Sequence, residues 1–205
     1  MKLYYAPGAC SIGIHVLLEE IGNPYQTEQV NLRDGAQFKP PFTGVNAKAK
    51  VPTLERDDGS ILTEFPVIAR WLARQNPQAN LIPKDEEADT RAMEAMEYIV
   101  GTIHSQGFTR IFRTDRFAPS QSDHEAVKAT GRENAEKGFA LIDKQLEGKQ
   151  YLAGEFSIAD AALFYVEYWG AKRADIQLPK NCAAHFDRMM SRPAVQRALQ
   201  QEGLN

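Results

Sequence analysis

The sequence predicts an α/β domain followed by an all-α domain, and three observations point to this division. Strand and helix signals alternate over the first 76 residues. Residues 77–84 contain two prolines and no hydrophobic periodicity, which is typical of a linker. From residue 85 to residue 205, apolar residues recur at helical spacing. We therefore expect domains at 1–76 and 85–205, joined by a linker at 77–84.

Turn-forming residues separate the elements of the first domain. Pro7-Gly8 ends the first strand, Gly22 stops the first helix, and residues 57–59 (DDG) are a strong hairpin signal between two strands. Thr63 is the expected N-cap of the last helix. In chain order, we predict a strand at 2–5, a helix at 11–21, strands at 27–32, 53–56 and 60–62, and a helix at 64–74.

Amphipathic periodicity predicts the helices of the second domain. Ser157 and Asp160 have the spacing of a capping box, a folding element that needs no ligand. Apolar positions on the first of these helices, between Met93 and Ile103, are interpreted as core or subunit interface. The expected helices are 86–112, 122–146, 157–173, 182–190 and 193–202.

Composition and charge exclude several classes of protein. The formal net charge is −3 and no basic run occurs, which argues against a nucleic-acid partner. The N-terminus lacks the apolar run of a signal peptide, and no stretch is long and apolar enough to span a bilayer. The two cysteines have no paired spacing, which suits free thiols in a reducing compartment. We therefore expect a cytoplasmic protein without a membrane segment.

Cys10 is the strongest candidate for a reactive group, because it stands where the first strand and turn give way to a helix. Unpaired N–H groups and the dipole at a helix start favour a thiolate over a thiol. A drop of about two pKa units would make the residue mostly thiolate at neutral pH. The alternative is a small buried thiol that only packs. Cys182 has no motif around it and is interpreted as such a packed thiol.

Several motifs occur in order along the whole chain. In the first domain they are 4–11 (YYAPGACS), 45–54 (VNAKAKVPTL) and 57–64 (DDGSILTE); in the second they are 104–108 (HSQGF), 157–160 (SIAD) and the ending at 202–204 (EGL). Together they resemble the bacterial beta-class glutathione S-transferases. The resemblance implies a thioredoxin-like first domain, an all-helical second domain, and a homodimer that binds glutathione and needs no metal ion.

The dipeptide Val51-Pro52 lies between a loop and a strand. Proline is permitted at a strand start, and X–Pro bonds are the ones that adopt the cis form at low cost. The resemblance implies a cis bond here, with the backbone of Val51 pairing with the cysteinyl part of glutathione as an added strand. Without the resemblance, an ordinary trans proline in a turn is the better interpretation.

Glu64 and Phe65 open the next predicted helix. A helix start binds carboxylates through its N–H groups, so the γ-glutamyl carboxylate could lie on the backbone of Phe65 while Glu64 takes the γ-glutamyl ammonium. The alternative is that Glu64 only complements the helix dipole. Phe65 departs from the family, which usually has a small or hydroxylated residue at this position.

The resemblance assigns three further positions on the first helix of the second domain. His104 would approach the glutathione sulfur beside Cys10 and help to keep it ionised. Glu97 and Gly101 would contact the glutathione bound by the facing subunit, although the family usually has asparagine where Glu97 stands. The loop near Gly35 also lacks a basic residue that some members use. The alternative for His104 is a half-buried helix histidine that only packs.

These residues favour a transferase that joins the glutathione thiolate to small apolar electrophiles. Because a cysteine stands at the sulfur-facing position, a glutathione-dependent thiol-disulfide transferase or peroxidase acting through Cys10 is the nearest alternative. A non-catalytic binding protein with the same fold is a second alternative. It is favoured by the departures at Phe65, at Glu97 and near Gly35.

Overall fold

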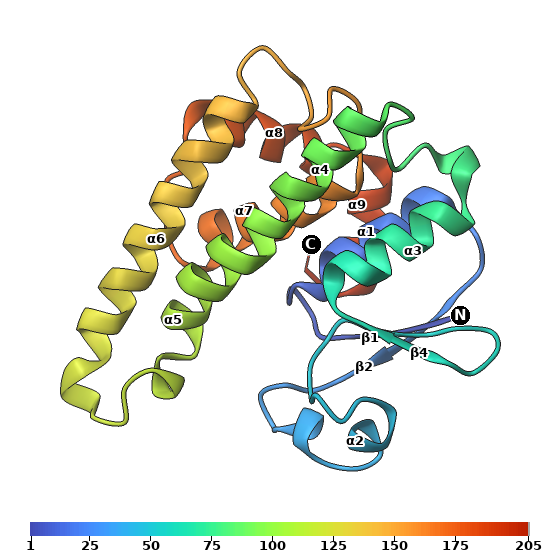
Figure 1. The fold of residues 1–205 in the computed structure, drawn as a ribbon. Helices are drawn as coiled ribbons and strands as arrows, with labels where there is room; N and C mark the ends of the chain where they lie inside the picture. The colour runs from blue at the N-terminus through green and yellow to red at the C-terminus, as the bar shows by residue number, and fades with distance from the viewer. Residues whose placement is uncertain (205) are drawn as a thin grey trace. The chain divides into compact units, whose positions relative to one another are not determined.

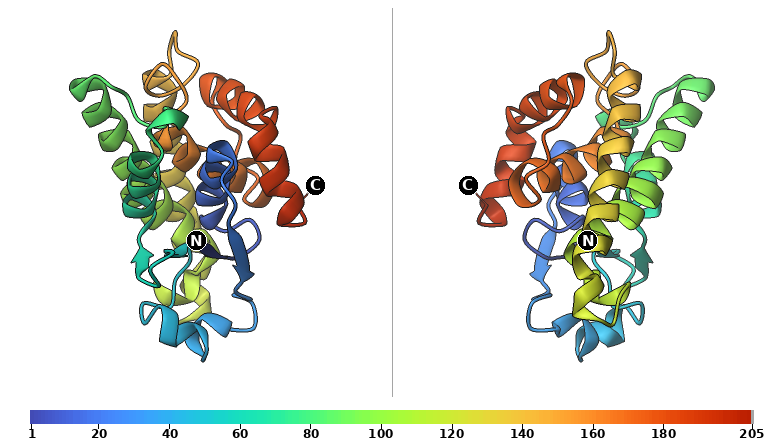
Figure 2. Two further views of the ribbon diagram at one scale, coloured as in Figure 1. Left: turned by 90° about the vertical axis from the view of Figure 1, so that its right-hand side faces the viewer. Right: turned by 90° about the vertical axis from the view of Figure 1, so that its left-hand side faces the viewer.

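In the computed structural model, which describes residues 1–204, the chain forms two units. The first contains Met1–Ile82 and the C-terminal segment that begins at Met190; the second is Pro83–Met189. The C-terminal segment was expected in the helical domain at 85–205. The structure groups it with the first unit because helix α9 (Pro193–Gln201) packs on helix α1 (Ser11–Ile21). Figure 2 shows these two helices side by side, α9 in red and α1 in blue.

The first unit is built on a four-stranded mixed sheet in the order β2-β1-β3-β4. Strand β1 pairs in parallel with β2 and antiparallel with β3, and β3 pairs antiparallel with β4. The second strand was expected at 27–32 but ends at Gln29, because its register is set by four residue pairs with β1. The strands are β1 (Lys2–Tyr5), β2 (Gln26–Gln29), β3 (Thr53–Glu55) and β4 (Ile61–Thr63).

Helices α1 and α3 (Phe65–Gln75) lie on one face of this sheet (Figure 1). Helix α1 has the predicted bounds and ends at Gly22, whose φ of 75° provides the left-handed cap. Thr63 is not the N-cap of α3, because it ends β4 and Glu64 takes that position. Three single-turn elements were not predicted, since one turn carries no hydrophobic periodicity: α2 (Phe42–Val45), η1 (Ala36–Phe38) and η2 (Pro77–Ala79).

The second unit is helical. The predicted helix at 86–112 is continuous, but its middle is π-helical: α4 (Glu86–Tyr98) leads into η3 (Ile99–Phe108) and then α5 (Thr109–Phe112). Figure 1 shows this rod beside helix α6 (His124–Gln145). The remaining elements are the short turns η4 (Thr114–Arg116) and η5 (Gln121–Asp123), and helices α7 (Ile158–Arg173) and α8 (Lys180–Met190).

Glycines allow η3 and α6 to approach closely. A Cβ added at Gly138 on α6 would lie 2.5 Å from Ile103 Cγ1, and one added at Gly107 would lie 3.1 Å from the backbone nitrogen of Ala135. Helix α7 is buried without interruption from Ile158 to Gly170, so it forms the core of this unit. Its start carries the predicted capping box. Within the described residues, no helix has the length and apolar character needed to cross a bilayer.

Candidate functional site

Cys10 lies at the predicted place, as the N-cap of α1. Its Sγ is 3.3 Å from the carbonyl oxygen of Val51, so the thiol donates a weak hydrogen bond to the loop before β3. The structure therefore brings together two of the site residues that the sequence analysis named. The contact joins the start of α1 to the loop at residues 46–52.

The expected lowering of the Cys10 pKa is wrong for this structure. Although the residue is partly exposed, burial of its sulfur raises the pKa of the Cys10 thiol to about 12. The backbone N–H groups of Cys10 and Ser11 and the charge of Lys50 act in the opposite direction but are outweighed. Cys10 is therefore a protonated thiol at neutral pH. Cys182, by contrast, is the packed thiol that was expected: it is fully buried, and burial raises its pKa.

The loop that carries Val51 is fixed by internal hydrogen bonds. The Val51–Pro52 bond is cis, as expected; Pro40–Pro41 is also cis, which was not anticipated. The buried side-chain amide of Asn46 donates to the carbonyl oxygen of Lys50 and to Thr53 Oγ1, both at 2.9 Å. Asn46 lies in the motif at 45–54, but no local pattern predicted this role.

Glu64 and Phe65 lie where α3 begins, as predicted. Glu64 has a φ of 68°, a left-handed conformation that is costly for a residue with a Cβ. Its carboxylate lies 2.7 Å from Lys48 Nζ, which also donates to Thr63 Oγ1 at 2.8 Å. The pairing of Lys48 with Glu64 was not predicted. Phe65 is only 4% exposed, so a contact with a ligand would come from its backbone.

In the second unit, His104 lies on η3 and is half-buried. Its Nδ1 is 3.2 Å from the hydroxyl of Tyr165, and Trp169 packs against its ring edge-on at 4.8 Å. Glu97 and Gly101 are exposed on the same helical rod, two turns and one turn before His104, respectively. The structure thus places these three residues on the expected element. Tyr165 and Trp169 were missed, since nothing in their local sequence points to His104.

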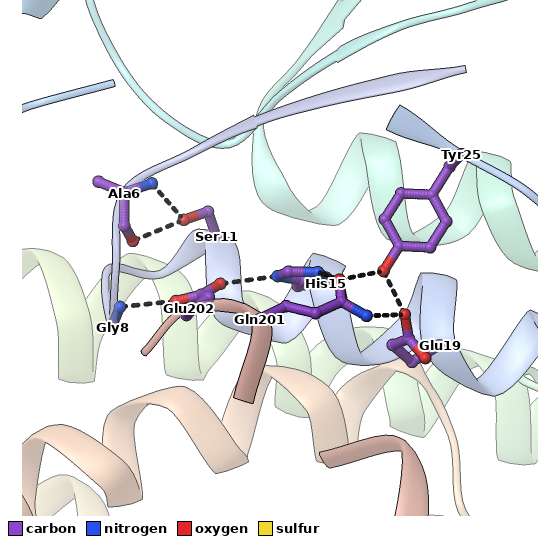
Figure 3. A network of polar contacts seen from close by, with 8 residues as sticks. All are labelled: Ala6, Gly8, Ser11, His15, Glu19, Tyr25, Gln201 and Glu202. Carbon is purple, nitrogen blue, oxygen red and sulfur yellow. Dashed lines mark hydrogen bonds and ion pairs between the residues drawn. The ribbon is translucent and has the colours of Figure 1, made fainter. Parts of the chain in front are cut away.

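A buried polar network supports the loop in front of Cys10 (Figure 3). The carboxylate of Glu202 accepts the backbone N–H of Gly8 at 2.7 Å and lies 2.9 Å from His15 Nδ1. The other ring nitrogen of His15 is 2.8 Å from Gln201 Oε1. The hydroxyl of Tyr25 donates a hydrogen bond to the same oxygen. His15 is fully buried and both of its ring nitrogens are engaged.

The described residues contain no group of three or more histidine, cysteine or acidic side chains that could hold a metal ion.

The candidate residues fall into two sets, one in each unit. In the first unit, Cys10 lies at the start of α1, Val51 and Pro52 lie in the loop before β3, and Glu64 and Phe65 lie at the start of α3. In the second unit, Glu97, Gly101 and His104 lie on one rod.

Comparison with known proteins agrees with the two-part fold. The profile of the glutathione S-transferase N-terminal domain family matches residues 8–75, and that of the glutathione S-transferase C-terminal domain family matches residues 86–193. The chain is 36% identical to the glutathione S-transferase GstA of Escherichia coli O157:H7, over the full length of both. It is 31% identical to the glutathione S-transferase GST-4.5 of Xanthomonas campestris, again over the full length of both.

Solved structures show the same similarity in three dimensions. A glutathione transferase homologue from Sulfitobacter with bound glutathione has a TM-score of 0.90 at 28% identity, covering 100% of this chain and 98% of that one. The bacterial beta-class glutathione S-transferase of Sphingomonas chungbukensis has a TM-score of 0.85 at 32% identity, with both chains fully covered. These similarities confirm the predicted fold class, a thioredoxin-like domain followed by an all-helical domain.

Proposed function

The chain belongs to the glutathione S-transferase family, and from this premise we propose that it binds glutathione on its first unit and joins the glutathione thiolate to small apolar electrophiles. In the reaction, the glutathione thiolate forms a new C–S bond to the electrophilic carbon. The displaced group leaves with the electron pair of the bond that breaks. The proposed step uses no metal ion.

The contacts around Val51 and Glu64 support the glutathione part of this proposal. Asn46 fixes the loop on both sides of Val51 through its hydrogen bonds to the carbonyl oxygen of Lys50 and to Thr53 Oγ1, and a peptide could pair with the backbone of Val51 as an added strand. Glu64 presents a carboxylate at the start of α3 from a strained backbone, and such strain concentrates at functional sites. The backbone of Phe65 at the helix start suits a ligand carboxylate.

The environment of the Cys10 sulfur carries the choice of reaction: Sγ is 3.3 Å from the carbonyl oxygen of Val51, to which the thiol donates, and its burial favours the protonated form. A thiol with a pKa of about 12 remains protonated at neutral pH and can donate a hydrogen bond to a glutathione thiolate. A free thiol such as that of glutathione has a pKa near 8.5 and ionises first. A thiol-disulfide transferase would instead need Cys10 as the attacking thiolate. The raised pKa therefore favours conjugation over disulfide exchange.

We also propose a cytoplasmic homodimer in which Glu97 and Gly101 contact the glutathione of the facing subunit, and in which His104 hydrogen-bonds the glutathione sulfur. The exposure of Glu97 and Gly101 is compatible with contact to another chain. The electrophile would meet an aromatic surface of the second unit. There, Phe112 is 40% exposed and packs on Phe108 and Trp169 at 5.7 Å between ring centroids.

Two activities measured on the same preparations test the proposal. Conjugation of glutathione to 1-chloro-2,4-dinitrobenzene and glutathione-dependent reduction of hydroxyethyl disulfide are compared for the natural chain and for Cys10→Ala. We expect the natural chain to conjugate, and Cys10→Ala to keep conjugation within about tenfold, because only one weak hydrogen bond is lost. Disulfide reduction that exceeds conjugation and disappears in Cys10→Ala would establish the exchange activity instead. Failure to bind immobilised glutathione would favour the non-catalytic alternative.

A further inference from the structure

The imidazole of His104 is held by two side chains of one helix. Tyr165 and Trp169 are four residues apart on α7, so they lie on the same face. The hydroxyl of Tyr165 is 3.2 Å from His104 Nδ1, and the two rings meet edge-on with 5.6 Å between centroids. Trp169 meets the His104 ring at 4.8 Å and an angle of 89°, and it packs against Tyr165 at 5.0 Å.

The burial of Tyr165 gives its hydrogen bond with His104 a structural role. Its side chain is 0% exposed, so its hydroxyl must find hydrogen-bond partners inside the protein. The contact with Nδ1 fixes both the rotation of the imidazole and the nitrogen that faces away from α7. With Nδ1 directed at Tyr165, Nε2 is on the opposite edge of the ring.

Helix α7 is itself anchored on its other face, so Tyr165 has little freedom to follow a moving histidine. Glu167 and Asp160 lie on that other face, 2.8 Å and 3.2 Å from the two ring nitrogens of His185 on α8. All three of these side chains are 0% exposed. The hydroxyl of Tyr165 is thus presented from a rigid support, which is what precise orientation of a catalytic group requires.

We propose that Tyr165 is the positioning residue of His104: its hydroxyl holds Nδ1 so that Nε2 faces the sulfur of glutathione. This inference rests on the proposed function, because it assumes that His104 acts on that sulfur. Tyr165 does not touch the substrate in this account and acts only through the histidine.

Removal of one oxygen tests the inference while the ring packing is kept. In Tyr165→Phe, we expect kcat for conjugation to fall about three- to tenfold, which is the loss expected for one hydrogen bond. The KM for glutathione should stay unchanged, and the pH profile of kcat should be displaced. Tyr168→Phe is the matched control, since Tyr168 is a buried tyrosine of the same helix that packs on Phe164 instead. It should behave like the natural chain.

A double-mutant cycle separates positioning from general packing. If Tyr165 acts through His104, Tyr165→Phe should have no further effect on kcat in a His104→Ala background. Losses that add in the double variant would overturn the inference. A His104→Ala variant with the natural kcat and pH profile would also overturn it, while the proposed conjugation would stand.

Nitrogen chemical shifts of the imidazole give a readout that needs no activity. The His104 signals, assigned by their absence in His104→Ala, should report one tautomer in the natural chain and a mixture in Tyr165→Phe. If the natural chain fails to conjugate glutathione, the proposed function fails, and these shifts alone decide whether Tyr165 orients the ring. Identical shifts in the two proteins would contradict the inference.

Discussion

The backbone N–H of Gly8 donates a 2.7 Å hydrogen bond to the carboxylate of Glu202, a residue 194 positions away in the chain. Gly8 belongs to the turn that delivers Cys10 to the start of α1, and Glu202 follows the last turn of α9. The second carboxylate oxygen lies 2.9 Å from the ring of His15, so the carboxylate has a partner on each side. The end of the chain therefore helps to fix the turn that carries the thiol.

Replacement of Glu202 should destabilise the first unit. In Glu202→Ala, the Gly8 N–H and the His15 ring would remain buried without this acceptor, which costs about 2–4 kcal/mol of unfolding free energy. Glu202→Gln keeps one acceptor oxygen and should cost less. Urea unfolding measures both, with Gln200→Ala on the exposed face of α9 as the control. Equal midpoints for Glu202→Ala and the control would contradict a role for this carboxylate.

The buried cluster on α7 and α8 should make stability depend on pH near neutrality. Burial raises the pKa of Glu167 to about 7, although His185 opposes the shift. Burial alone would lower the pKa of His185, but Glu167 and Asp160 raise it to about 10. Both groups therefore bind protons more tightly in the folded state. By linkage, the contribution of Glu167 is fully present below its unfolded pKa of about 4.5 and is lost as the pH rises through 7.

Glu167→Gln imitates the protonated form and should remove the part of this dependence that comes from Glu167. Between pH 4.5 and 8, the natural chain should lose on the order of 2 kcal/mol relative to the variant, because only its carboxyl group must ionise in a buried place. Urea midpoints across that range measure the difference. Glu133→Gln changes an exposed carboxylate and serves as the control. Parallel curves for Glu167→Gln and the natural chain would refute the assigned titration.

Variants of the Glu64–Lys48 ion pair distinguish an effect on glutathione binding from an effect on folding stability. Both side chains are about half exposed, so their pairing at 2.7 Å should contribute less than about 1 kcal/mol to folding. If Glu64 receives the ammonium of glutathione, Glu64→Gln should raise the KM for glutathione about tenfold or more. Lys48→Ala removes the same ion pair but keeps the carboxylate, so it should not raise this KM. A similar rise in both variants would show that the ion pair, rather than a contact with glutathione, is responsible.

Local signals predicted the parts of the fold that depend on short stretches of chain. Helix α1 has its predicted bounds because Gly22 stops it, and the capping box of Ser157 and Asp160 forms as its spacing indicates. The π-helical run around His104 was not foreseen. It depends on how the rod packs against α6 and α7, and no local pattern distinguishes it from an α-helix.

In the candidate site, too, features set by nearby residues were predicted, and features set by the folded chain were not. The positions of Cys10 and Glu64 at helix starts follow from turn and strand signals nearby, and both were predicted. The pKa of Cys10 was predicted in the wrong direction, because the burial that raises it is set by the folded chain and not by the residues beside it. Glu202 was quoted only as part of a motif, since a contact across 194 positions leaves no trace in local sequence.

The central claim is that the glutathione sulfur, and not Cys10, supplies the thiolate. The ultraviolet absorbance of thiolate is measured as a function of pH in the Cys182→Ala variant, in which Cys10 is the one remaining cysteine. Without glutathione, we predict no thiolate below about pH 10, in line with the raised pKa of Cys10. With glutathione bound, a thiolate should appear below the ordinary thiol pKa of about 8.5, and it should persist when Cys10→Ala is added. A thiolate already present at pH 7 without glutathione would contradict the account.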